Sequence, residues 1–206
     1  MRASRAGRSG ADPPVATSSI QRTCGECSLC CTVLRVDELA KLGGTPCRHL
    51  GAEGGCSIHP RRPQICRSYE CLWLRGAFDE NDRPDRLGAV LDLIQTGDGV
   101  SLAIREGVPG AFERSPRLQE IAAQHRETMP VRITNADDVM NPDKPFKILL
   151  RGGEEQRVEG DVVWIYRDGQ RVDARRLSWL GRQLRRIALQ LAGWRLRRIR
   201  ARGSKA

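Results

Sequence analysis

Short apolar runs predict a strand-rich body in the middle of the chain. Alternating or continuous apolar residues between turn residues predict β-strands within 88–96, 100–106, 131–134, 146–150 and 162–172. The last run contains Asp168-Gly169, a dipeptide typical of a two-residue hairpin turn. A helix is predicted from Pro116 to Thr128. Residues 77–172 are therefore predicted to form an α+β body.

The end of the chain, 173–206, carries the period of a helix. Six apolar residues follow at three- and four-residue steps and share one helical face: Leu177, Leu180, Leu184, Ile187, Leu191 and Trp194. Arginines fill the other faces, and Asp173 is predicted as an N-cap or first-turn acid. The apolar face either packs on the body or binds elsewhere. Residues 195–206 are too charged for a core, which leaves a solubilising end or a docking segment.

The stretch 21–76 follows neither period and contains every cysteine of the chain. They are Cys24, Cys27, Cys30, Cys31, Cys47, Cys56, Cys66 and Cys71. Its apolar residues are too few to close a core alone, and small domains of this kind need metal or disulfide links. Residues 21–76 are therefore predicted to be a cysteine-rich module, preceded by a disordered lead over 1–20.

Charge separates the body from the tail. Residues 1–172 hold 24 basic and 24 acidic side chains, whereas 173–206 holds 11 basic and one acidic. The whole excess of +10 lies in the tail, so RNA or an anionic membrane surface is a candidate partner for 173–206. No apolar run is long enough to span a membrane, and no secretory signal is visible. The reducing cytoplasm is the expected location.

Sequence motifs for common enzyme classes are missing. The chain has no dinucleotide-binding, P-loop or zincin motif. The acidic stretch 137–143, with Asp137, Asp138 and Asp143, is interpreted as a solvated turn. No catalytic residue is assigned, and whether the protein is an enzyme stays open.

Three uses of the eight cysteines compete: disulfides, structural zinc and an iron–sulfur cluster. The expected location disfavours disulfides. If 24–31 were helical, Cys24, Cys27 and Cys31 would converge and Cys30 would point about 60° further round. Cys66 and Cys71 would lie about 140° apart on one helix, so they face one metal only if that helix breaks between them. Gly51, Gly54 and Gly55 predict a tight turn in a ligand loop.

The cysteine segments resemble the YkgJ-type cysteine-cluster family. The resemblance rests on "CGECSLCC", on Cys56 and on "RRPQICRSYEC", which match its CxxCxxCC and RPxxCR segments with eight cysteines in all. Members are described as zinc- or iron-chelating proteins, and related segments in flagellin lysine methylases hold an iron–sulfur cluster. The resemblance covers about a quarter of the chain and implies that all eight cysteines are metal ligands. Arg62, Pro63 and Arg67 are its motif residues, and His59 stands where relatives have an aromatic.

Two functions follow as expectations. The first is a metal-chelating protein that binds an iron–sulfur cluster, with an electron-transfer or protein-modification accessory role toward an unidentified redox or protein partner. Arg62 and Arg67 either contact the cofactor or have a structural role, with hydrogen bonds to carbonyls of the loop. The second is a zinc-stapled, non-catalytic module that docks on nucleic acid or anionic membrane through its basic tail.

Overall fold

The computed structural model describes residues 22–97, 99–136 and 144–203. Its helices, 3₁₀ helices (η) and strands follow the chain in this order: α1 Cys30–Val33, η1 Asp37–Leu39, η2 His59–Arg61, α2 Gln64–Ser68, η3 Glu80–Asp82, α3 Pro84–Leu87, β1 Ala89–Thr96, β2 Gly99–Glu106, α4 Ala111–Arg114, α5 Pro116–His125, β3 Val131–Asn135, β4 Phe146–Leu149, η4 Arg151–Gly153, β5 Glu154–Glu159, β6 Val162–Arg167, β7 Gln170–Arg176 and α6 Trp179–Gly203. The α+β class is confirmed. The lead 1–20 and the acidic residues Asp137, Asp138 and Asp143 lie outside the described residues.

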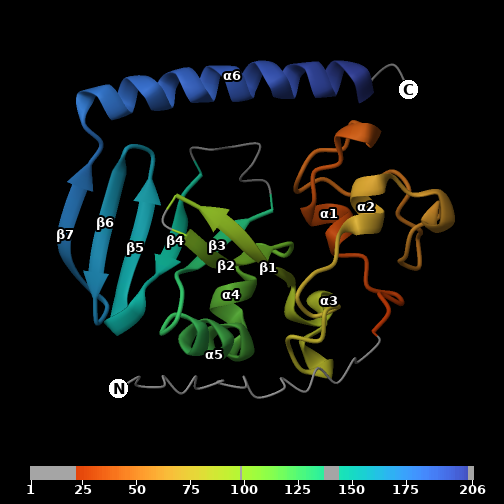
Figure 1. Cartoon of the computed structure of the whole chain (residues 1–206), viewed down its shortest axis with the longest axis horizontal. Helices are drawn as coiled ribbons and strands as arrows, with labels where there is room; N and C mark the ends of the chain where they lie inside the picture. The colour runs from red at the N-terminus through yellow and green to blue at the C-terminus, as the bar shows by residue number, and fades with distance from the viewer. Residues whose placement is uncertain (1–21, 98, 137–143, 204–206) are drawn as a thin grey trace, which may run out of the picture.

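One seven-stranded sheet, in the order β1 to β7, forms the body. Neighbouring strands are antiparallel except β2 and β3, which are parallel. A parallel pair needs a crossover, and α4 and α5 supply it (Figure 1). Asp168 and Gly169 both have positive φ, as the predicted hairpin turn requires.

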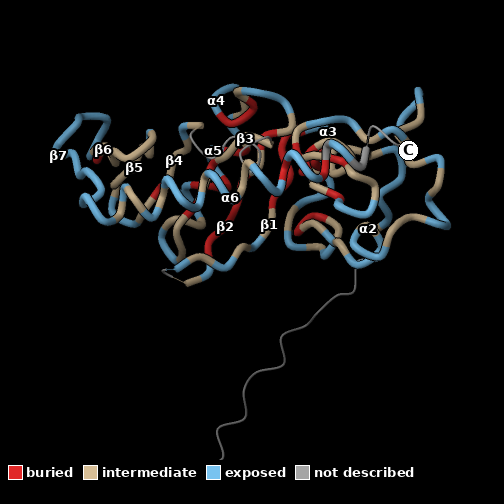
Figure 2. Tube along the Cα trace, turned by 90° about the horizontal axis from the view of Figure 1, so that it is seen from above, coloured by how far each residue is buried: buried red, intermediate tan, exposed pale blue. Residues whose placement is uncertain are grey.

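The main core lies between the first strands and α5. Leu102, Ile104 and Val131 of the sheet are fully buried, as are Leu118 and Ile121 of α5. Ser115 caps α5 by accepting a hydrogen bond from the Leu118 amide at 3.2 Å. Burial falls toward β7, every residue of which is exposed (Figure 2).

The cysteine-rich module, described here from residue 22 to 76, packs against the opposite end of the sheet from β7 (Figure 1). The Leu72 amide donates to the Leu91 carbonyl at 3.1 Å, and Leu72 belongs to the body's core cluster. The Tyr69 hydroxyl donates to Asp92 at 3.0 Å. The module is therefore held on β1 by an apolar contact, a backbone bond and a side-chain bond.

The turn after β2 also packs against the module, through Gly107. A Cβ added to Gly107 would lie 2.6 Å from Leu29 Cδ1 and 3.1 Å from Val33 Cγ2. We expect Gly107→Ala to lower the free energy of unfolding by about 1–2 kcal/mol, because overpacking forces neighbours out of place. Gly97→Ala, where no atom lies within 4 Å of the added Cβ, is the matched control. Urea unfolding measures both, and equal stability of the two variants would contradict this packing.

Two helix predictions are wrong in detail. Asp173 lies inside β7 and does not cap the last helix, which begins at Trp179. Ser178 takes that role, since its hydroxyl accepts from the Gly181 amide at 3.1 Å. The helix predicted to reach Thr128 ends at His125. β5, which the hydrophobic pattern did not indicate, fills the sheet between β4 and β6.

Candidate metal centre

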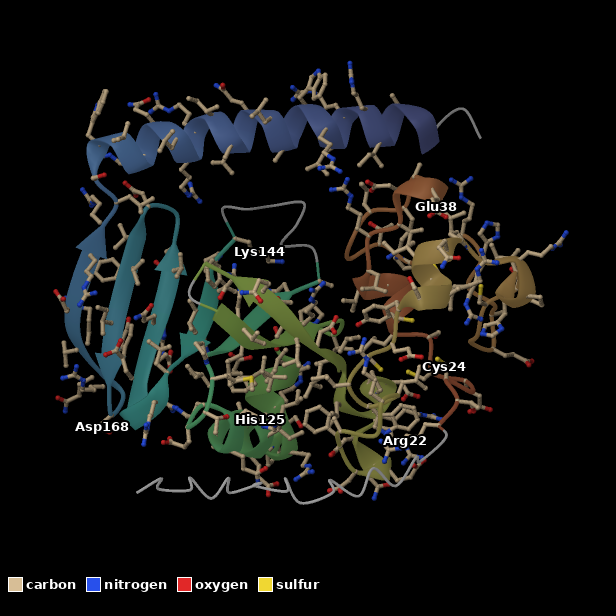
Figure 3. All side chains as sticks on the ribbon, in the orientation of Figure 1. Arg22, Cys24, Glu38, His125, Lys144 and Asp168 are labelled. Carbon is tan, nitrogen blue, oxygen red and sulfur yellow. The ribbon has the colours of Figure 1, made fainter. Side chains whose placement is uncertain are left out.

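All eight cysteines line one cavity of about 600 Å³ in the module. None forms a disulfide; Cys24 is exposed and the other seven are half-buried. Much of the remaining wall is aliphatic: Leu34, Val36, Leu39, Ile58, Leu74 and Val90. Figure 3 labels Cys24 near the start of the described chain, between the module's loops and α3. The fold thus brings together thiols that are up to 47 residues apart in the chain.

Short local structures position the thiols. Cys24 and Cys27 lie in a turn closed by the Cys27 amide and the Cys24 carbonyl at 2.9 Å, and a helix starts only at Cys30. The Cys47 amide donates to the Cys31 carbonyl at 3.0 Å, which aligns the second loop with α1. The helical geometry considered for 24–31 therefore applies only from Cys30 onward, because the residues before it form turns.

The glycine loop turns as predicted. Leu50 and Cys56 form an isolated antiparallel bridge, and the Gly51 amide donates to the Gly55 carbonyl at 3.1 Å. Gly54 has φ of 90°, and a Cβ there would come within 3.0 Å of the Glu26 carbonyl oxygen. A side chain at Gly54 would separate this loop from the Cys24–Cys27 turn, so glycine serves both the turn and the contact.

Charge interactions link Cys66 to three other thiols. Burial is the largest cause that raises the pKa of Cys66, and charges at Cys31, Cys47 and Cys56 add to it. We call these four the inner set.

The remaining thiols interact in the same way. Burial is the largest cause that raises the pKa of Cys71, and negative charge at Cys24 and Asp92 adds to it. Burial also raises the pKa of Cys27, and charges at Asp85 and Cys71 contribute. The outer set is Cys24, Cys27, Cys30 and Cys71.

Cys30 and Cys31 join the two sets. The Cys30 thiol donates a hydrogen bond to Cys31, which raises the pKa of Cys30 and lowers that of Cys31. Charges at Cys24 and Cys27 also raise the pKa of Cys30. A helical 24–31 would have grouped Cys31 with Cys24 and Cys27 and set Cys30 apart; in the structure Cys30 interacts with Cys24 and Cys27, and most strongly with Cys31. α2 ends at Ser68, and Cys66 and Cys71 fall into different sets.

Positive charge lies near the inner set. Lys41 is 7% exposed, and its Nζ donates to the Thr32 carbonyl at 2.7 Å and to the Leu34 carbonyl. Burial lowers the pKa of Lys41 to about 8, while the thiolates of Cys47, Cys31, Cys30 and Cys66 oppose this. Lys41 could not be predicted from the sequence, because a single lysine outside the cysteine motif carries no spacing signal.

The two motif arginines differ in position. Arg62 donates to the Cys66 carbonyl at 3.3 Å and to the His59 ring, and its charge helps lower the pKa of Cys31. Arg67 borders the same cavity but is exposed, and it donates to the Gln64 side chain at 3.0 Å. Of these two arginines, Arg62 is the one that both donates a hydrogen bond to the cysteine-bearing segment and lowers the pKa of a thiol.

The described residues contain no group of three or more His, Cys, Asp or Glu side chains already arranged to hold a metal ion. The cysteine side chains line the cavity and do not converge on one point within it. Their chemistry nevertheless fits soft metals, since thiolates are the common protein ligands of zinc and iron–sulfur clusters.

None of the helices within the described ranges combines the length and apolar character needed to cross a bilayer. Comparison with protein families, curated proteins and solved structures gave no match for this chain. The resemblance to the YkgJ-type family therefore rests on the cysteine motif alone.

Proposed function

We propose that this protein binds metal in the cysteine cavity, with the inner and outer sets as two four-thiolate sites. The observation that carries the proposal is that all eight cysteines line one cavity. Charge interactions favour Cys31, Cys47, Cys56 and Cys66 as one site and the other four cysteines as the second. Four thiolates complete the coordination of a zinc ion or of an iron–sulfur cluster.

Iron–sulfur clusters are the favoured occupants. A cavity of about 600 Å³ suits a group larger than a single ion, because a cluster reaches thiols on separate walls. Such a cluster would supply one-electron redox chemistry. The aliphatic side chains would lower the polarity around such a cluster, and Lys41 and Arg62 would offset part of the negative charge of the inner set. The proposed role is electron transfer, or assistance to modification of another protein.

The two sets differ in their electrostatic surroundings. In addition to burial, negative charge at Asp85 and Asp92 raises the pKa of Cys27 and Cys71 of the outer set, whereas positive charge at Lys41 and Arg62 helps to lower the pKa of Cys31 of the inner set.

Structural zinc is the alternative. Two Cys₄ zinc sites would use the same ligands and would stabilise the module without redox chemistry. In that case the protein is a non-catalytic binding module whose basic tail docks on nucleic acid or on an anionic membrane.

Metal analysis of protein purified without oxygen tests the proposal. We expect a brown protein with iron and acid-labile sulfide in stoichiometric amounts, because eight thiolates can hold two clusters. Protein reconstituted with zinc alone serves as the colourless control. A folded, colourless preparation with about two zinc ions per chain and no sulfide would establish the zinc alternative. Folded protein without any metal would contradict both.

A further inference from the structure

The long C-terminal helix exposes the apolar face that its sequence marks as a core face. Five side chains, each 48–62% exposed, form what we call the outer stripe: Leu180, Leu184, Ile187, Leu191 and Trp194. They follow at steps of four and three residues, so they occupy about 80° of the helix. Of the two alternatives left open for this face, packing on the body is not the one observed, because its side chains are exposed.

A different face of α6 meets the protein. Leu196 and Ile199 are buried, at 8% and 6% exposed. They lie about 160° and 100° round the helix from Leu180. The C-terminal half also approaches the cysteine module, since Arg195 lies 3.8 Å from Asp37. The helix is thus held by one side, and the outer stripe points away from the body.

The position of α6 leaves the stripe accessible to a flat surface. The helix has 25 residues, or a length of about 37 Å, and runs along one outer side of the molecule (Figure 1). Figure 2 looks onto this side and shows α6 in front of the sheet and the module. In Figure 3, side chains project from α6 on the side away from the sheet. A plane can therefore touch the stripe along the helix.

The charge of α6 indicates what kind of surface the outer stripe would bind. The helix contains eight arginines and no acidic residue or lysine. Exposed arginines include Arg182, Arg186 and Arg197, and Arg198 lies 3.6 Å from the Trp194 ring centroid. Leucine and tryptophan with flanking arginine is the composition of helices that lie in the interface of anionic membranes.

We propose that α6 docks the protein on an anionic lipid bilayer, with the outer stripe inserted among the acyl chains and the arginines at the headgroups. A second copy of the chain is disfavoured as the partner of the stripe. Two α6 helices packed together would bring their arginines close, and α6 has no acidic residue to offset the repulsion. Nucleic acid is disfavoured because phosphates would leave the apolar stripe exposed. The proposal goes beyond metal binding and does not depend on which metal is bound.

Vesicle co-sedimentation of the full-length protein tests the proposal. We expect binding to phosphatidylcholine vesicles that contain phosphatidylserine, weaker binding at high salt, and little binding to phosphatidylcholine alone. The variant Leu184→Glu/Leu191→Glu places two charges in the stripe. Gln183→Glu/Gln190→Glu adds the same charge about 100° round the helix, at the edge of the stripe. The stripe variant should bind at least about tenfold more weakly than this control.

Several outcomes would overturn the proposal. Equal binding by the two double variants would mean that charge alone holds the protein. Failure of the unaltered protein to bind anionic vesicles, or binding to RNA with none to vesicles, would exclude the bilayer as partner. A dimer that Leu184→Glu/Leu191→Glu dissociates would assign the stripe to a second copy. Circular dichroism and metal content of each variant report folding and metal binding separately from docking.

Discussion

Replacing Cys66 or Cys71 with serine is expected to remove a different half of the bound metal. The two residues are five positions apart, but Cys66 interacts with Cys31, Cys47 and Cys56, and Cys71 with Cys24. Each single variant should keep about half of the metal, because the other four thiolates remain complete. The double variant should keep none and lose the module's structure, since metal-binding energy there stabilises the fold.

Metal per soluble chain and visible absorption measure this effect. Ser68→Ala, an exposed position between the two cysteines, is the control and should keep the full metal content. Complete loss in either single variant would indicate one shared centre. If the metal that remains in each single variant gave the same visible absorption spectrum, this would contradict the claim that the two sites have different surroundings. Full retention in both would remove these cysteines from the ligand set.

Replacing Arg117 with alanine is expected to lower the free energy of unfolding by about 2 kcal/mol at pH 7, because Asp82 is buried but Arg117 is 34% exposed and solvent screens part of the pair. Asp82 is 2% exposed, and Arg117 donates to its two oxygens at 2.9 and 2.7 Å. The third donor is the Asp79 amide at 3.1 Å. Without Arg117, a buried carboxylate loses its charged partner, and η3 loses its link to α5.

The pH dependence of this loss follows from the pKa of Asp82. Hydrogen bonds from Arg117 are the largest cause that holds this pKa below its usual range. The unfolded-state pKa is about 3.9, so the pair stabilises the fold above about pH 4 and less as pH falls further. The difference between the unaltered protein and Arg117→Ala should therefore shrink at low pH.

Urea unfolding at neutral and acidic pH measures both effects. Arg86→Ala is the matched control, because Arg86 is exposed and donates to the Asn81 side chain at 2.9 Å. That variant should change stability by no more than about 0.5 kcal/mol. A loss in Arg117→Ala that is as small as in Arg86→Ala, or that grows toward low pH, would contradict the buried pair.

Local patterns were sufficient for much of the sheet. The runs at 88–96 and 100–106 became β1 and β2, because apolar periodicity and turn residues act on nearby backbone. Asp168-Gly169 specified its hairpin because both residues tolerate positive φ. β5, with the sequence EEQRVE, was missed because it forms a strand through hydrogen bonds with β4 and β6, not through its own apolar content.

Composition and local pattern are enough to establish the number of thiols, their concentration in one segment, the position of the positive charge and the helical period of the tail. Tertiary structure decided which cysteines interact with which, because Cys47, Cys56 and Cys66 reach Cys31 through loops whose closure no local pattern describes. It also decided that Lys41 lies beside them. Periodicity shows which side chains share a helix face, such as Leu184 and Leu191, but what that face meets depends on where the helix packs. In this protein the stripe is exposed, whereas Leu196 and Ile199, on another side of α6, are buried.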